Sequence, residues 1–214
     1  SIFKSMDKLR QSLQQARDEE RTRLMEDKKR NWANEGFAKF GEILRQPSTD
    51  FNEYCYSIIY NMVKYLGANQ GGIFIVSDEK DQETLELKAC YAYDRKKHVE
   101  KMLEAGEGLA WACYAEKETI LMTNVPKDYP HITSGLGGQT PGCVIIVPLK
   151  TDKEVCGVIE IASFDNIEKH QVLFIEKIAE SIASSICNAR VNIRTAYLLE
   201  QSKQQAEEMR AQEE

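Results

Sequence analysis

The sequence predicts an α+β fold, in which helices cover a central antiparallel sheet and a long helix extends from each end of the domain. Residues 143–149 form a continuous apolar run, whose length and β-branched content favour a buried strand. A polar turn at 151–154 leads into a second strand over 155–164, so the two strands predict a central hairpin. Both ends of the chain are polar, helix-forming and almost free of glycine. These three observations define the fold class.

A second hairpin is predicted before the central one. Residues 71–76 form an apolar strand that opens with two glycines, and we expect these glycines to let another backbone approach closely. After a turn at 78–81, residues 84–93 alternate between apolar and polar side chains. Strand geometry then places a set of side chains on one face: Leu85, Leu87, Ala89, Tyr91 and Tyr93. In the central hairpin the corresponding face holds Val155, Gly157, Ile159 and Ile161.

The N-terminal 46 residues predict one long helix. Its first part carries apolar residues with the four-three spacing of a heptad repeat, which drives helices to pair as a coiled coil: Ile2, Met6, Leu9, Leu13 and Ala16. The apolar stripe changes phase between Trp32 and Leu44, and that part is expected to pack against the domain. Pro47 ends the helix.

Shorter helices are predicted inside the domain. Ser48 or Thr49 can cap a helix over 51–66, which Gly67 ends. A short amphipathic helix is expected over 95–105, with Val99, Met102 and Leu103 inward. Gly106 and Gly108 separate it from another helix over 109–115. Residues 119–122 predict a short strand. The proline- and glycine-rich loop 124–142 is long enough to be functional or disordered, and its place between buried strands favours a functional segment.

The C-terminal helix is expected to begin near His170, to cover the sheet and to continue into a polar tail. Its apolar stripe includes Ile175, Ile178 and Ile182, and no stop signal follows. The chain therefore divides into an N-terminal signalling helix (1–46), a central domain (47–190) and a C-terminal coiled-coil output helix (191–214).

Composition narrows the functional classes. The net charge is −6 and the pI about 5.3, which argues against nucleic acid as a partner. The six cysteines form no CxxC pair and no zinc spacing with the three histidines, so reduced core thiols in the cytoplasm are expected, without a metal. No segment is long and apolar enough to cross a membrane, and the chain reads as part of a longer protein.

Four motifs in this order resemble a GAF domain over about 51–189. They are GEGLA at 106–110, the strand 119–124, IIVPL at 145–149 and VCGVIEIA at 155–162, followed by a long helix. The helix 30–45 is similar to those that precede GAF domains in bacterial membrane-linked sensor proteins, and 1–13 resembles the last helix of a HAMP linker. The resemblance implies a cytoplasmic sensory or relay domain of a larger receptor, anchored in the inner membrane. A two-component histidine kinase is one such receptor.

A GAF domain implies a parallel homodimer and a small-molecule pocket on the face of the sheet away from the dimer helices. The residues expected around this pocket combine aromatic walls with a few polar groups: Trp111, Tyr129, His131, Thr133, Ser134, Thr140 and Cys143. The alternative is that Trp111 and Tyr129 are core residues and the pocket is collapsed. No cofactor is predicted, and an unidentified small ligand would be the occupant.

Known GAF chemistries are not matched. The phosphodiesterase cyclic-nucleotide signature cannot be placed, and His131 lacks the adjacent cysteine of bilin-binding members. Free methionine sulfoxide reductases carry cysteines where this chain has Ala110 and Ser134, although Cys113 and Cys143 lie nearby in sequence. We therefore expect no enzyme activity in this fragment. A variant reductase and a ligand-free dimerisation spacer are the alternatives.

The surface is the favoured place for three further side chains. Glu160, between Ile159 and Ile161, is expected to face solvent at a sheet edge; the alternative is that it lies as a charge in the pocket. His98 and His170 are expected to be exposed on helices.

Overall fold

The computed structural model describes residues 2–46, 48–77, 83–92, 95–97, 101–127, 129, 132–134 and 137–212. Contacts divide the chain into two compact units, 1–39 and 40–214. The helices are α1 (Ile2–Arg45), α2 (Phe51–Leu66), α3 (Gly108–Glu116) and α4 (Lys169–Gln212). The strands are β1 (Gln70–Ser77), β2 (Thr84–Ala92), β3 (Arg95–Lys97), β4 (Met102–Leu103), β5 (Ile120–Met122), β6 (Ile132–Ser134), β7 (Gly137–Gln139), β8 (Cys143–Lys150) and β9 (Val155–Ser163).

The first unit is helical throughout its described part, which belongs to α1. The predicted N-terminal helix is therefore confirmed, while Pro47 lies outside the described residues. The heptad residues Ile2, Met6, Leu9 and Leu13 are all more than half exposed in the single chain. This helix therefore presents an apolar seam that its own unit does not cover.

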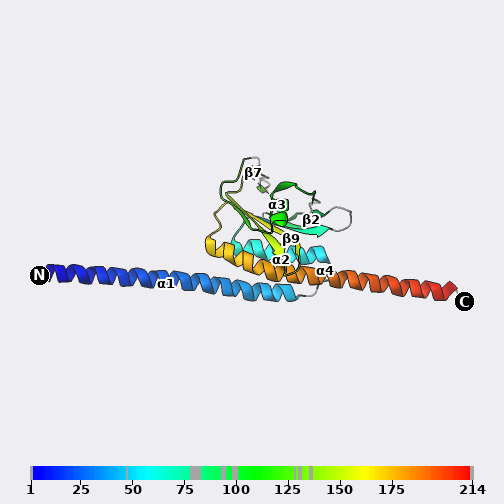
Figure 1. Cartoon of the computed structure of the whole chain (residues 1–214), viewed down its shortest axis with the longest axis horizontal. Helices are drawn as coiled ribbons and strands as arrows, with labels where there is room; N and C mark the ends of the chain where they lie inside the picture. Colours follow the sequence, from blue (N-terminus) through cyan, green and yellow to red (C-terminus); the bar gives the residue numbers. More distant parts are fainter. Residues whose placement is uncertain are drawn as a thin grey trace. The chain divides into compact units, whose positions relative to one another are not determined.

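The second unit is built on an antiparallel sheet whose described strands run in the order β3-β2-β1-β9-β8-β5, with β4 paired to β2 (Figure 1). Both predicted hairpins, β1–β2 and β8–β9, are confirmed, and β1 pairs with β9 to join them. Strand β9 therefore lies inside the sheet. The backbones of β1 and β9 lie close at Gly157, where an added Cβ would come within 2.1 Å of the Phe74 carbonyl oxygen.

Helices α2 and α4 cover one face of the sheet, and α3 lies on the other (Figure 1). The helical layer is closed by the rings of Phe40, Tyr65 and Phe174, with centroids 5.4–6.2 Å apart. The N-cap of α2 is Asp50, whose carboxylate accepts from the Asn52 and Glu53 amides. The predicted caps Ser48 and Thr49 are thus one or two residues early. Gly67 ends α2 in the left-handed region, as expected.

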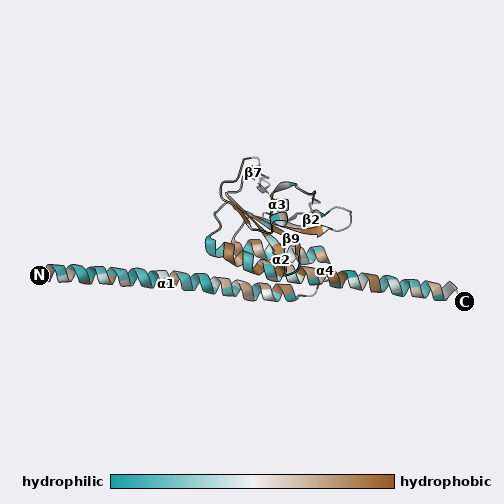
Figure 2. Ribbon diagram, in the orientation of Figure 1, coloured by the Kyte–Doolittle hydropathy of each residue, from teal (hydrophilic) through white to brown (hydrophobic). Residues whose placement is uncertain are grey.

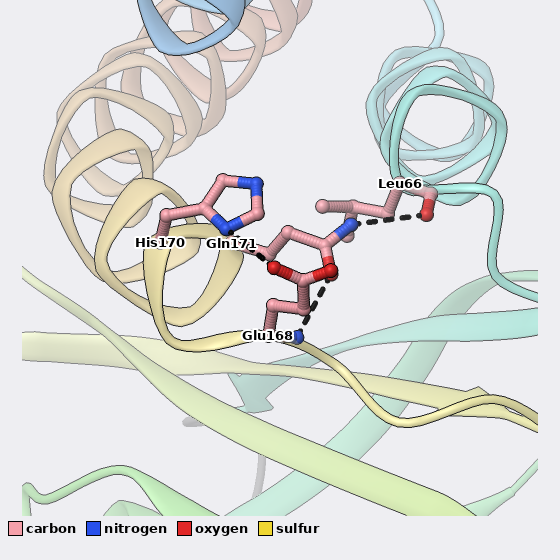
Figure 3. A network of polar contacts seen from close by, with 4 residues as sticks. All are labelled: Leu66, Glu168, His170 and Gln171. Atoms are coloured by element: carbon pink, nitrogen blue, oxygen red, sulfur yellow. Dashed lines mark hydrogen bonds and ion pairs between the residues drawn. The ribbon is translucent and has the colours of Figure 1, made fainter. Parts of the chain in front are cut away.

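The start of α4 is tied to the end of α2 by Gln171 (Figure 3). Its amide oxygen accepts from the Glu168 backbone amide at 2.9 Å, and its amide nitrogen donates to the Leu66 carbonyl at 3.4 Å. His170 Nδ1 lies 3.2 Å from the Glu168 carboxylate, and the His170 ring is half-buried rather than exposed as expected. The Gln171 side chain thus satisfies one backbone group at the start of α4 and one at the end of α2.

The predicted helix over 95–105 is wrong. Residues 95–97 pair with the end of β2, and 102–103 pair with Leu85 and Glu86. The open edge of β2 offers backbone hydrogen bonds that this short segment can complete, and Leu103 is buried beside the sheet. Val99 and His98 lie outside the described residues. The loop 124–142 also contains a short hairpin, β6–β7.

A β-bulge changes the predicted face of β2. The register shifts between Ile73 and Phe74, so Ala89 pairs with Ile73 whereas Leu87 pairs with Phe74. Leu85 and Leu87 therefore lie on the α3 face, while Ala89 and Tyr91 lie on the α2 face; Tyr93 is outside the described residues. Gly71 likewise faces α2, where an added Cβ would meet the Val63 side chain at 2.6 Å. This glycine admits helix side chains rather than another backbone.

Candidate functional site

The face of the sheet beneath α3 carries an apolar cluster drawn from six described strands, α3 and the loop after β5. Its buried members are Phe74, Val76, Leu85, Leu103, Ala110, Cys113, Val144, Ile146, Val158 and Ala162. Partly buried aromatic residues pack against it, namely Trp111, Tyr114, Tyr129 and Phe164. This face therefore has the apolar floor and aromatic margins of a small-molecule site.

Glu160 brings a carboxyl group to this face. It alternates with Ile159 and Ile161, and its neighbours two positions away, Val158 and Ala162, belong to the apolar cluster. Its pairing partners are Gly72 on β1 and Ile146 on β8. The predicted position at an exposed sheet edge is wrong, because β9 has a strand on each side and Glu160 is largely covered.

The electrostatic environment of Glu160 is set by burial and by two partners. Burial raises the pKa of the Glu160 carboxyl, while the hydrogen bond with Tyr129 and the positive charge of Lys101 act in the opposite direction. Burial and the nearby Glu160 charge also raise the pKa of Tyr129. Tyr129 therefore stays a neutral phenol that can donate its hydrogen to the Glu160 carboxyl group.

The predicted site residues divide into three groups. Tyr129 and Trp111 both pack on the α3-side cluster, and Thr140 is half-buried at the end of the loop. Thr133 and Ser134 lie in β6, where only the backbone is described, and His131 is outside the described residues. Cys143 is fully buried and alternates with Val144, so it faces the α2–α4 layer and does not share a face with Tyr129.

Trp111 also borders an open cleft at the end of α3. Its ring centroid is 5.2 Å from that of Tyr114, whose hydroxyl donates to Glu83 at 3.2 Å. The cleft has a volume of about 450 Å³, and its polar lining includes Lys117, Lys153 and Arg190. Trp111 thus contributes to the core with one part of its ring and to an exposed cleft with another.

The thiols of the predicted reductase alternative do not converge. Cys113 is buried beneath α3, where its thiol donates to the Ile146 carbonyl at 3.5 Å, and burial raises its pKa to about 12. Cys143 lies on the opposite face of the sheet. A protonated, buried thiol is a poor nucleophile, so this pair lacks the arrangement that a reductase requires.

For Glu160 the favoured prediction is wrong, whereas the alternative, a charge in the pocket, fits its place on the α3 face. The signal was present, since a single charge inside the apolar strand 155–162 is costly unless it has a partner. What the sequence could not supply was the partner, because Tyr129 lies 31 positions earlier in an irregular loop.

The part of the chain that the structure describes contains no cluster of histidine, cysteine and acidic side chains suited to a metal ion. In the same residues no helix is long and apolar enough to cross a membrane.

Comparison with known proteins identifies a family. The GAF domain profile matches residues 48–186. The GAF domain of A. aeolicus nlh2 in an inactive state is 22% identical with a TM-score of 0.56, covering 74% of this chain and 94% of that one. The GAF domain of a phosphoenolpyruvate-protein phosphotransferase from Coxiella burnetii is 19% identical with a TM-score of 0.58, covering 72% and 90%. A fragment of a methyl-accepting chemotaxis protein is 17% identical with a TM-score of 0.53, covering 67% and 93%. No curated protein is matched.

Proposed function

Because this chain belongs to the GAF domain family, we propose that it is a sensory and relay domain that binds a small organic molecule beneath α3. The observation that carries the proposal is the Glu160–Tyr129 pair, a hydrogen-bonded carboxylate and phenol on an otherwise apolar face. Ionisable groups shifted by burial and by a specific partner are concentrated at functional sites. The proposed ligand carries a hydrogen-bond donor or a positive charge for Glu160, and an apolar body for the surrounding cluster.

Trp111 and Thr140 are the other described residues proposed to contact the ligand, on α3 and at the end of the loop. His131, Thr133 and Ser134 are kept in the proposal on the strength of their place in the same loop. Cys143 is left out because it lies on the other face of the sheet.

The relay part of the proposal rests on β9. Glu160 faces the site, whereas its neighbours Ile159 and Ile161 are fully buried on the opposite side, where the helical layer lies. Helix α4 packs against β8 and β9 and continues without a break to Gln212. A ligand that displaces β9 by a small amount would therefore bias the position of α4 directly. In this organisation 1–46 delivers or receives motion, 47–190 senses, and 191–214 transmits.

A homodimer is proposed as the working unit. Along α4 every described side chain from Arg194 to Arg210 is exposed in the single chain, and Tyr197, Leu198 and Leu199 are more than half exposed. Figure 2 shows hydrophobic residues continuing along α4 past the sheet. Exposed apolar residues at this density on a helix favour pairing with a second helix.

The cellular setting is proposed from the N-terminal resemblance to HAMP-linked sensors and from the chemotaxis and phosphotransferase proteins among the structural neighbours. We propose a cytoplasmic position in a larger receptor that is anchored in the inner membrane, with a histidine kinase or comparable output. The proposal assigns no catalytic residue to this fragment and no nucleic-acid partner.

The experiment is native mass spectrometry of the protein as purified from cells. We expect a non-covalent small molecule on the wild-type chain, and its loss in the Tyr129→Phe/Glu160→Gln variant, which removes the phenol hydrogen bond and the negative charge. Glu118→Gln, at an exposed turn, is the matched control and should keep the molecule. Equal retention by the wild-type chain and the double variant would place the ligand elsewhere.

A further inference from the structure

Two cysteines lie where the central hairpin meets α4, Cys156 and Cys187. Cys156 lies in β9 at a bulge, because Leu149 pairs with Gly157 while Lys150 pairs with Val155. Cys187 lies on α4, one helical turn after Ala183. Neither residue belongs to the Glu160–Tyr129 site.

The bulge directs Cys156 toward the helix. Its sulfur lies 3.4 Å from the Leu149 carbonyl oxygen and 3.8 Å from the Ala183 carbonyl oxygen. Cys187 projects from the same helix one turn after Ala183, whose carbonyl oxygen the Cys156 sulfur contacts. The Cys156 sulfur therefore lies across the boundary between sheet and helix, against the part of α4 that carries Cys187.

The two thiols differ in their access to solvent. Cys156 is only 4% exposed, whereas Cys187 is half-buried. Cys187 lines an open groove of about 760 Å³, together with Lys150, Lys153, Ser184 and Asn188. Cys187 is therefore the more accessible of the two thiols to a small oxidant dissolved in water. Burial and the contact with Cys187 also raise the pKa of Cys156, which suits a partner that reacts second rather than first.

We propose that Cys156 and Cys187 form a reversible redox pair that responds to hydroperoxides and fixes α4 to the central hairpin. In the first step the Cys187 sulfur attacks a peroxide oxygen. The O–O bond breaks, Cys187 becomes a sulfenic acid, and one water leaves when hydrogen peroxide is the oxidant. In the second step the Cys156 sulfur attacks the Cys187 sulfur, the S–S bond forms and the S–OH bond breaks. Cys156 loses its proton and a second water leaves. The two thiols supply the two electrons that reduce the peroxide, and a dithiol reverses the change.

A disulfide between Cys156 and Cys187 would restrict the movement of α4 relative to the sheet. Cys187 is in the part of α4 that packs on the sheet, about two turns before the helix becomes continuously exposed at Arg194. A covalent bond there removes the freedom of α4 to slide or rotate against β9, whatever occupies the α3 face. The redox pair would thus act on α4 independently of the proposed ligand.

Peptide mapping tests the pair directly. The reduced full chain is treated with hydrogen peroxide, its remaining thiols are blocked, and it is digested with trypsin. Cleavage after lysine and arginine places Cys156 in peptide 154–169 and Cys187 in peptide 178–190, each with a single cysteine. We expect these two peptides to be covalently linked after oxidation and separate after dithiothreitol. The link should be absent in Cys187→Ser and unchanged in Cys90→Ser, which alters the other half-buried thiol.

The change in melting temperature on oxidation is a second test, for the case in which a variant folds poorly. Oxidation should raise the melting temperature of the wild-type chain and leave that of Cys187→Ser unchanged, because only the wild type gains the cross-link. The proposal is overturned if peroxide converts Cys187 to sulfinic acid without linking it to Cys156. It is equally overturned if Cys187 links two chains to each other, or if the oxidised wild type melts no higher than the reduced form.

Discussion

At the scale of single residues, burial of Glu160 costs hydration of its carboxyl group, and the same group is the proposed contact for a ligand. A carboxylate among apolar side chains loses hydration, and here the Tyr129 hydroxyl and the charge of Lys101 offset part of that loss. The net direction is a raised pKa, so the folded domain binds a proton at Glu160 more tightly than the unfolded chain does. A ligand with a donor or a positive charge would recover the remaining loss.

Glu160→Gln tests this balance through stability. A carboxyl group whose pKa is raised by folding stabilises the folded state fully below the unfolded pKa of about 4.3. This stabilisation is lost as the pH rises through the folded pKa. The amide keeps an acceptor for Tyr129 and carries no charge. We therefore expect the variant to melt above the wild type at pH 8, with a difference that shrinks as the pH falls toward 4. Thermal unfolding followed by circular dichroism measures this difference, and Glu118→Gln is the control. A variant that melts lower at pH 8 would show that the charge is well solvated or well paired.

Residue-level features were predictable in part. Tyr129 and Trp111 were assigned to the site from their position in the chain, and both contact the α3-side cluster. Cys143 was also assigned, but strand alternation turns it to the other face. The face of a strand residue depends on register, and nothing in the local sequence of 143–149 distinguishes its two apolar faces.

At the scale of elements, the central hairpin requires a glycine where β9 passes β1. Because an added Cβ at Gly157 would lie 2.1 Å from a backbone oxygen, Gly157→Ala must separate the two strands. We expect it to lower the free energy of unfolding by about 3 kcal/mol or more, measured by chemical denaturation. Gly41→Ala is the matched control. Its added Cβ meets only the end of the Arg45 side chain at 3.5 Å within α1, so a gain of up to about 1 kcal/mol is expected. Equal effects of the two substitutions would contradict the close approach.

The junction between α2 and α4 depends on Gln171. Replacing it with alanine removes one acceptor and one donor at two helix ends. We expect a loss of about 1 kcal/mol in the free energy of unfolding, because both helix ends are partly open to water. Gln171→Glu should recover the contact to the Glu168 amide but not the one to Leu66, and so give an intermediate value. A Gln171→Ala variant as stable as the wild type would mean that water replaces both bonds fully.

Element prediction succeeded where hydrophobic periodicity extended over many residues. The long helices and the four main strands are long enough for their hydrophobic periodicity to identify them. The segment 95–105 failed because three apolar residues at helical spacing also fit short edge strands, and the open edge of β2 decided between them. The bulge in β2 could not be predicted, because apolar and polar residues continue to alternate through it.

At the scale of the whole molecule, both terminal helices present apolar residues that their own units leave exposed. Replacing Leu9 and Leu13 with lysine puts two charges into the heptad seam of α1. We expect the dimer dissociation constant to rise by more than about tenfold in sedimentation equilibrium. The control replaces Gln11 and Gln14 with lysine, which adds the same charge to exposed positions outside the seam. An unchanged dimer in the leucine variant would show that the seam does not hold the chains together.

The central claim is that the α3 face is a built ligand site, and a thermal-shift screen of metabolites and nucleotides tests it most directly. We predict a compound that raises the melting temperature of the wild-type chain in proportion to the logarithm of its concentration, and has a much smaller effect on Tyr129→Phe/Glu160→Gln. If every active compound shifts the wild type and the double variant equally, binding occurs outside the Glu160–Tyr129 pair and the central claim is wrong.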